Sequence, residues 1–252
     1  MLIAIEGVDK SGKETQANLL LERMQRECRN ARKIEFPNYR SEASAAVKMY
    51  LNGDFGKNPD DVNPYAASLF FAVDRYASYK TEWGAFHNAG GIIIADRYTM
   101  SNMIHQGAKF PDAHERRKFI DWLIDLEFKK IGLPEPDVVI FLDLSMELRV
   151  QLLEKEPATS PSTTRKTSIS SEATTQKSTP ATENKIPHDT PPLKRGADIH
   201  EQDLGYLRRA HDCAREIAAQ LGWKCIDAGR DGALRPALEI HEDLYNIIAP
   251  II

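Results

Sequence analysis

Short, continuous apolar runs recur along this chain and alternate with longer segments that have helical spacing. The runs at residues 2–5, 92–95 and 138–142 have the length and composition of buried parallel strands. Less apolar strands are expected at residues 34–37 and 224–226. The expected helices span residues 14–28, 41–51, 63–88, 113–130, 146–155, 198–221 and 233–248. This alternation predicts an α/β fold with a parallel sheet flanked by helices.

One segment breaks the alternation. Residues 157–192 consist largely of Ser, Thr, Pro, Lys and Glu, with almost nothing apolar. Such a segment buries too little surface to offset the entropy cost of ordering it, so we expect it to be disordered. Because the helical pattern resumes afterwards, we interpret it as an insertion within a single domain that spans residues 1–252.

Composition excludes several classes of protein. The 252 residues are 42% apolar, which suits one compact domain, and a net charge of −4 argues against nucleic-acid binding. No apolar run approaches the length of a membrane span. Cys28, Cys213 and Cys225 are widely spaced and odd in number, which indicates reduced thiols. A strand that begins at Leu2 leaves no room for a targeting peptide, so we expect a cytoplasmic protein without membrane contact.

The first strand leads into a motif that is typical of polyphosphate binding. Gly7, Gly12 and Lys13 meet the pattern G-x-x-x-x-G-K between a strand and a helix. The loop amides, the helix N-terminus and the lysine would together hold the phosphates of a nucleoside triphosphate. The expected ATP-binding loop comprises Gly7, Val8, Asp9, Lys10, Ser11, Gly12, Lys13, Glu14 and Thr15. Glu14 occupies the position where a Ser or Thr hydroxyl normally reaches magnesium.

A second polar group follows the run at residues 92–95. Asp96, Arg97 and Tyr98 would lie at the carboxyl end of a buried parallel strand, the edge at which α/β sheets bind ligands. An aspartate there can reach a metal ion or its water ligands, and an arginine can clamp a phosphate group. A salt-bridged helix cap is the alternative interpretation.

Seven segments, including the two motifs above, occur in the order typical of the thymidylate (dTMP) kinase family and resemble that family. They cover the chain outside the insertion and are E-G-V-D-K-S-G-K-E-T-Q at 6–16, F-P-N-Y at 36–39, L-F-F-A-V-D-R-Y at 69–76, D-R-Y-T-M-S-N-M-I-H-Q at 96–106, L-P-E-P-D at 133–137, F-L-D-L at 141–144 and D-I-H-E-Q-D-L at 198–204. The resemblance implies a P-loop nucleoside monophosphate kinase fold of three layers. It also implies transfer of the γ-phosphoryl group of MgATP to dTMP, giving dTDP and ADP.

The resemblance also assigns roles to the phosphate-binding residues. Lys13 would hold the β- and γ-phosphates, Arg97 would lie between donor and acceptor phosphates, and Asp9 would lie near the metal and the acceptor 3′-hydroxyl. Together these three form the expected catalytic set. Magnesium would be bound by Asp9, Glu14 and Asp96, directly or through water.

The expected dTMP-binding residues are Asp9, Tyr39, Phe71, Arg75, Arg97, Ser101, Asn102 and His105. Phe71 would stack on the base, Arg75 would donate to thymine O4, and Ser101 and Asn102 would complete the base edge. Tyr39 would bind the acceptor phosphate. His105 stands where the family usually has Tyr or Phe beside the sugar, so discrimination against ribonucleotides would be looser. Phe71 as simple core, Tyr39 as a surface phenol and His105 as an ordinary helix residue remain alternatives.

The family closes an arginine-bearing lid over ATP at the place where this chain has its insertion. Lys194 and Arg195 are the preferred lid cations, with Arg195 expected at ATP, and Arg165 is a weaker candidate. The resemblance also implies a homodimer. Two other functions stay open at this stage: a related kinase acting on another nucleotide or deoxynucleoside, and a nucleotide-binding scaffold with little catalytic activity.

Overall fold

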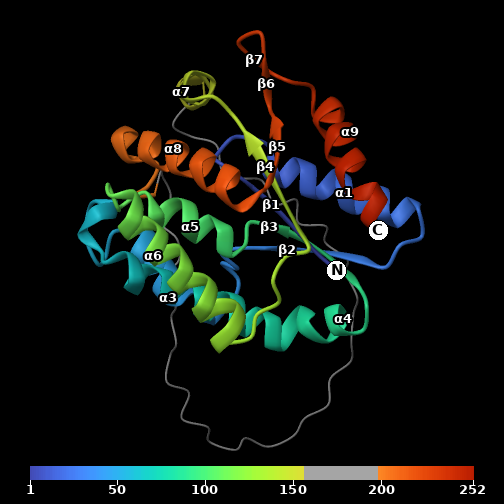
Figure 1. The fold of residues 1–252 in the computed structure, drawn as a ribbon, viewed down its shortest axis with the longest axis horizontal. Helices are drawn as coiled ribbons and strands as arrows, with labels where there is room; N and C mark the ends of the chain where they lie inside the picture. The colour runs from blue at the N-terminus through green and yellow to red at the C-terminus, as the bar shows by residue number, and fades with distance from the viewer. Residues whose placement is uncertain (156–197) are drawn as a thin grey trace, which may run out of the picture.

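The computed structural model describes residues 1–155 and 198–252, which form one parallel sheet between two layers of helices (Figure 1). The sheet has the order β2-β3-β1-β4-β5, and every neighbouring pair is parallel. Its strands are β1 (Leu2–Gly7), β2 (Ala31–Glu35), β3 (Ile92–Asp96), β4 (Val138–Asp143) and β5 (Lys224–Asp227). The expected α/β class and the three central strands are therefore confirmed.

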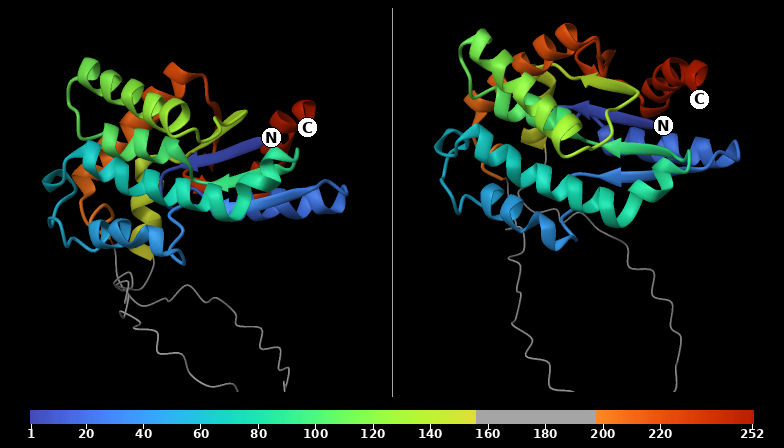
Figure 2. Two further views of the ribbon diagram at one scale, coloured as in Figure 1. Left: turned by 90° about the horizontal axis from the view of Figure 1, so that it is seen from below. Right: turned by 60° about the horizontal axis from the view of Figure 1, so that its bottom comes forward.

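The helices divide between the two faces of the sheet (Figures 1 and 2). They are α1 (Lys13–Arg26), α2 (Ala45–Leu51), α3 (Pro64–Ser78), α4 (Gly84–Asn88), α5 (Thr99–Gly107), α6 (Ala113–Ile124), α7 (Met146–Lys155), α8 (Leu204–Leu221) and α9 (Ala237–Ile248). Ile3 and Ile5 of β1 pack in the cluster that includes α1 and α9, whereas Leu2 and Ala4 pack in the cluster that includes α5, α6 and α8. Successive side chains of β1 therefore point to opposite faces of the sheet and pack in two separate apolar cores.

Two long expected helices contain π-helical turns. The segment expected at 63–88 runs as α3, a π turn at Tyr79–Trp83 and α4, and the segment at 113–130 runs as α6 and a π turn at Asp125–Lys130. The segment at 41–51 begins with a 3₁₀ turn at Glu42–Ser44 and continues as α2. The apolar pattern marked these segments correctly but could not distinguish the type of turn.

Two helix starts were predicted wrongly. The helix expected from residue 198 begins at Leu204, where Asp203 caps it by accepting a hydrogen bond from the Tyr206 amide at 2.9 Å. The helix expected from residue 233 begins at Ala237, because residues 229–234 form the hairpin of β6 (Gly229–Arg230) and β7 (Ala233–Leu234). Helix α5, which follows Asp96-Arg97-Tyr98 directly, was not anticipated.

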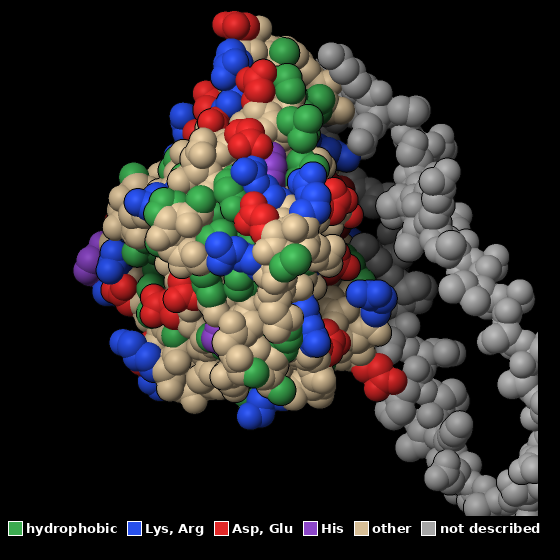
Figure 3. Space-filling model, turned by 90° about the vertical axis from the view of Figure 1, so that its right-hand side faces the viewer, with side chains coloured by type: hydrophobic (Ala, Val, Ile, Leu, Met, Phe, Trp, Pro, Cys, Tyr) green, Lys and Arg blue, Asp and Glu red, His purple; other side chains and the backbone are tan. Residues whose placement is uncertain are grey.

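The visible surface and the cysteines show how charges and thiols are distributed. In the face shown in Figure 3, basic and acidic side chains are interspersed and do not form a basic field. Within residues 1–155 and 198–252, no helix is both long and apolar enough to cross a membrane. Cys28, Cys213 and Cys225 are all free thiols. The insertion expected at 157–192 lies outside the described residues, as do Arg165, Lys194 and Arg195.

Candidate active site

The phosphate-binding loop connects β1 to α1 and depends on its glycines. Gly7 has φ of 153°, and a Cβ there would lie 2.6 Å from Ser11 Oγ and 2.7 Å from the Leu142 carbonyl oxygen. Gly12 has φ of 90° and directly precedes the helix. Only glycine adopts such conformations without strain, so the loop can turn tightly and direct its amides inward.

Lys13 folds back over this loop. Its Nζ donates a hydrogen bond to the Val8 carbonyl oxygen at 2.7 Å and lies 4.0 Å from Asp9 Oδ1. Burial, helped by the nearby charge of Arg97, lowers the pKa of Lys13 to about 8, although Asp9 acts in the opposite direction. The protonated form of this lysine binds an anion, and the bound anion in turn stabilises the protonated form.

Asp9 lies between two arginines from different elements. Its Oδ1 accepts a hydrogen bond from Arg97 Nη2, and its Oδ2 accepts one from Arg149 Nη2 at 3.0 Å. Burial opposes ionisation of Asp9, but Arg97, Lys13 and Arg149 outweigh it and hold the pKa of that carboxyl well below its usual range. Arg97 comes from the loop after β3 and has φ of 67°, which is unusual for a residue with a side chain. The chain therefore holds Arg97 against Asp9 by backbone geometry as well as by charge.

A cavity opens beside this cluster, at the carboxyl edge of the sheet. All of the predicted dTMP-binding residues line it: Asp9, Tyr39, Phe71, Arg75, Arg97, Ser101, Asn102 and His105. Three further lining residues, Asp198, His200 and Glu201, come from the segment that precedes α8. The structure thus brings together residues that are dispersed over most of the chain, next to the phosphate-binding loop.

Arg75 is held by a partner that the sequence did not reveal. Its Nε donates to Glu127 Oε2 at 2.7 Å and its Nη2 donates to Glu127 Oε1 at 2.6 Å, and both residues are buried. Thr99 Oγ1 donates to Glu127 Oε2 at 2.8 Å. Glu127 lies in the π turn that follows α6. The bidentate pair occupies one edge of the guanidinium and fixes its plane.

Glu6 holds two residues that line the cavity, Tyr98 and Ser101. Its carboxylate accepts hydrogen bonds from the Tyr98 amide and from Ser101 Oγ, both at 2.7 Å. Burial raises the pKa of Glu6, against the charge of Arg97 and these hydrogen bonds. Because the Ser101 hydroxyl donates a hydrogen bond to Glu6, its oxygen acts as an acceptor toward other groups, and Arg97 Nη1 lies 3.5 Å from it. Asn102 is buried, and its Nδ2 lies 3.3 Å from the Ser68 carbonyl oxygen.

His105 belongs to an aromatic stack at the cavity wall. Its ring is nearly parallel to that of His200, with centroids 5.2 Å apart and an interplanar angle of 9°. His200 Nε2 lies 2.8 Å from Tyr50 Oη, and Tyr206 Oη donates to the His105 carbonyl oxygen at 2.8 Å. Burial lowers the pKa of His105 to about 3, although Asp9 acts in the opposite direction, so the ring is neutral at physiological pH. The motif D-I-H-E already contained His200, but its contact with His105 is a tertiary feature.

The three expected metal residues occupy different surroundings. Asp96 is buried at the end of β3, Asp9 is paired with arginines, and Glu14 is exposed at the start of α1. In the part of the chain that the structure describes, their carboxylates do not come together within 4.8 Å of one another. Magnesium at this place would therefore take most of its ligands from phosphate oxygens and water, as it commonly does.

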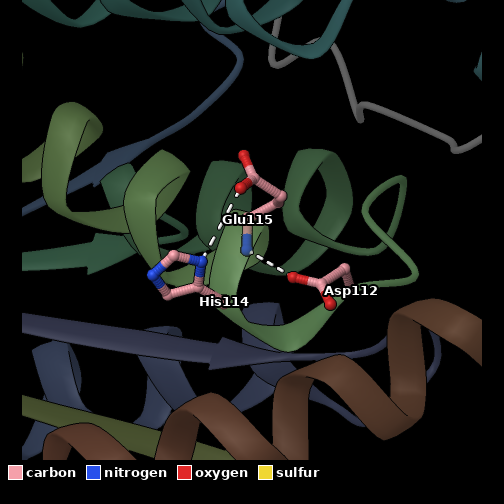
Figure 4. A group of neighbouring side chains, drawn as sticks. All are labelled: Asp112, His114 and Glu115. Carbon is pink, nitrogen blue, oxygen red and sulfur yellow. Dashed lines mark hydrogen bonds and ion pairs between the residues drawn. The ribbon is translucent and has the colours of Figure 1, made fainter.

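Among the described residues, an exposed group that does lie this close together is Asp112, His114 and Glu115 at the start of α6 (Figure 4). Asp112 Oδ1 accepts a hydrogen bond from the Glu115 amide at 2.9 Å, and His114 Nδ1 lies 3.7 Å from Glu115 Oε1. Both contacts are those of a helix N-cap and its neighbours. The group is explained by helix capping and lies apart from the cavity residues.

Comparison with known proteins identifies the family of this chain. The model of the family described as Thymidylate kinase matches residues 5–179. The chain is 34% identical over 151 residues to the thymidylate kinase of Mycobacterium tuberculosis. The matched segment makes up 59% of this chain and 68% of that protein. It is 26% identical over 250 residues to the probable thymidylate kinase of Pyrobaculum aerophilum, across 99% of this chain and 97% of that protein.

A solved structure extends the comparison to the fold. The thymidylate kinase of Candida albicans superposes with a TM-score of 0.64 at 22% identity, and the match covers 99% of this chain and 91% of that one. The fold is therefore that of a P-loop nucleoside monophosphate kinase, as the sequence predicted. With the family match, the ordered motifs and the phosphate-binding loop in place, the chain belongs to the thymidylate kinase family.

Proposed function

We propose that this protein transfers the γ-phosphoryl group of ATP to dTMP, giving dTDP and ADP. The observation that carries the proposal is that Asp9 and Arg97 belong to both halves of the site. Asp9 is part of the phosphate-binding loop, Arg97 is hydrogen-bonded to it, and both line the cavity. A donor phosphate on the loop and an acceptor phosphate in the cavity would meet at this pair. The family membership supports this assignment and disfavours the two alternative functions.

The phosphate-binding residues supply positioning and positive charge, which is most of what phosphoryl transfer requires. Lys13 and the loop amides hold the β- and γ-phosphates of ATP. Arg97 turns from Asp9 toward the phosphates, where its guanidinium neutralises charge on the transferring oxygens. Asp9 lowers the cost of keeping Arg97 partly buried before the substrates bind, because the two form an ion pair.

The cavity residues select the acceptor. Phe71 provides an aromatic face for the base, and Arg75 offers the guanidinium N–H groups that Glu127 does not use to the thymine O4. A cytosine has a donor at the same position, so Arg75 would oppose it. Asn102 completes the base edge, Tyr39 binds the acceptor phosphate, and His105 borders the sugar.

Magnesium fits the site as an ion bound mainly by the phosphates, with Asp96 and Asp9 nearby and Glu14 at the mouth of the loop. When bound, it would neutralise charge on the β- and γ-phosphates. Arg195 at ATP, a cytoplasmic location and disorder of residues 157–192 stay predictions from the sequence.

A homodimer is supported by one surface of α3. Leu69, Val73 and Tyr76 are exposed at 45%, 57% and 41%, and their spacing puts them on one face of the helix. Phe71 and Arg75 come from the same helix and line the cavity. A second copy of the chain packed on Leu69, Val73 and Tyr76 would bury these side chains and brace the acceptor site.

A coupled assay of ADP formation with MgATP tests the function. We expect turnover with dTMP and far weaker turnover with thymidine, dCMP, dGMP and dAMP. Turnover of thymidine in place of dTMP would assign the chain to deoxynucleoside kinases. ATP binding without turnover of any acceptor would support the scaffold alternative and refute the proposal.

A further inference from the structure

Arg149 is a buried cation at the phosphate-binding loop that none of the assigned roles uses. It lies on α7 and is 1% exposed, and its Nη2 donates to Asp9 Oδ2 at 3.0 Å. Its other two nitrogens, Nε and Nη1, are also buried, and neither has a hydrogen-bond partner in the structure as described. Three of the five N–H groups of the side chain therefore lack an acceptor.

Unpaired donors of a buried arginine are costly, because burial removes water without replacing it. Burial also lowers the pKa of Arg149, although Asp9 acts in the opposite direction. The pair with Asp9 does not explain the arrangement, since Asp9 already has Arg97 and Lys13 within ion-pair distance. Arg116, by contrast, donates from Nη1 to the Phe110 carbonyl oxygen and from Nη2 to a carboxylate oxygen of Glu216.

The surroundings of Arg149 identify the missing acceptor as a phosphate. Its guanidinium contacts the same carboxylate as Arg97, within the loop that would bind the donor nucleotide. We propose that Arg149 is a further catalytic residue, which gives its free N–H groups to the terminal phosphate of ATP and to the transferring phosphoryl group. The contact with the transferring phosphoryl group rests on the proposed function, whereas the contact with the terminal phosphate of ATP does not.

The position gives Arg149 a specific part in the reaction. Arg97 and Arg149 approach Asp9 through different oxygens, so the two guanidiniums flank the carboxylate. A terminal phosphate placed beside Asp9 would meet one arginine on each side. Charge that develops on the transferring oxygens would then be neutralised by two preformed cations in a water-poor site.

The variant Arg149→Met keeps the length and apolar stem of the side chain and removes all its donors. We expect kcat with dTMP to fall ~10²-fold, in the range typical of a lost transition-state donor, and the KM for dTMP to change less than about threefold. Arg23→Met is the matched control. Arg23 donates to Glu242 at 2.8 Å on the remote surface between α1 and α9, and its loss should leave kcat unchanged.

Two further measurements separate a catalytic residue from a merely structural one. Equilibrium binding should show that Arg149→Met weakens ATP at least tenfold but ADP less than threefold, because only ATP carries the terminal phosphate. The melting temperature of the nucleotide-free variant should equal or exceed that of the wild type, because unpaired buried donors are removed. A structural arginine would instead give a lower melting temperature and an unchanged ratio of ATP to ADP affinity.

These outcomes distinguish failure of the inference from failure of the proposed function. If wild-type protein does not phosphorylate dTMP but the ATP to ADP ratio still falls in Arg149→Met, the function is wrong and the phosphate contact stands. If wild type is active and the variant retains kcat within threefold and the same affinity ratio, the inference is wrong. The same holds if Asp9→Asn alone reproduces the full loss and Arg149→Met adds nothing to it, since Arg149 would then act only through Asp9.

Discussion

Glu127→Gln tests whether the geometry of Arg75 determines recognition of the base. In the wild type, both carboxylate oxygens accept from Arg75 at 2.6 and 2.7 Å inside the protein. Glutamine keeps one acceptor and places an NH₂ donor against the other guanidinium nitrogen. The change removes one charge-assisted hydrogen bond, worth ~1.5–3 kcal/mol, and the compensating charge of a buried arginine.

Two consequences of different kind follow. The stability loss of ~2–3 kcal/mol should lower the melting temperature by roughly 5–10 °C for a chain of this size. Arg75, no longer held in one plane, should bind dTMP more weakly. A loss of ~1.4 kcal/mol corresponds to a tenfold rise in the KM for dTMP. The preference for dTMP over dCMP should fall with it, while kcat stays within a few fold, because Arg75 lies on the base side of the cavity.

Steady-state titration with dTMP and dCMP, together with thermal unfolding, measures both effects. Thr99→Val is the matched control, since it removes a hydrogen bond to the same carboxylate without touching Arg75. It should lower the melting temperature slightly and leave the KM for dTMP unchanged. A Glu127→Gln protein that melts earlier but keeps the wild-type KM and base preference would show that Glu127 is only a structural partner.

Three other predictions concern residues at the phosphates and the sugar. Affinity for ATP should fall about tenfold per pH unit above about pH 8, because the pKa of Lys13 in the nucleotide-free protein is about 8 and ATP binds the protonated lysine. Lys13→Ala should weaken ATP binding and abolish this pH dependence in an equilibrium titration. His105→Tyr should raise the ratio of kcat/KM for dTMP over the ribonucleotide form of TMP, and an unchanged ratio would remove His105 from the sugar wall. Glu14→Gln should raise the magnesium concentration needed for half-maximal activity, whereas Glu14→Ser should retain more activity. Identical metal titrations would exclude a metal role for this exposed side chain.

Much of the site could be predicted from the sequence because local geometry determines it. The spacing of Gly7, Gly12 and Lys13 defines a loop, and the run before Asp96 defines the strand that places Arg97 at the sheet edge. Parallel pairing of β1 with β3 then brings these two strand ends side by side, with Ile5 opposite Asp96. The dTMP-binding residues were assigned by the resemblance to the thymidylate kinase family and not by spacing, and all of them line one cavity.

The partners of these residues could not be predicted, because their separation along the chain carries no spacing signal. Glu127 is 52 residues from Arg75, and Arg149 is 140 residues from Asp9. Each lies in a segment whose apolar pattern explains the helix but not the charged residue within it. The prediction of where α8 starts was wrong for a related reason. Asp198 and Asp203 each accept a hydrogen bond from the amide three residues later, so both have the contacts of a helix cap, and Ile199 beside Asp198 belongs to the buried cluster of Val47 and Leu51.

These buried charges change how the site should be understood. Residues that contact substrate are recognisable by type and place, whereas Glu127 and Arg149 are recognisable only by whether their hydrogen bonds are complete. Glu127 has both oxygens satisfied, and we expect its contribution to be to hold Arg75 in place before the base binds. Arg149 has Nε and Nη1 unsatisfied, and we propose that a bound phosphate accepts from them. In a site built to bind charged substrates, a complete hydrogen-bond set marks preorganisation, and an incomplete buried set marks where the substrate's own charge belongs.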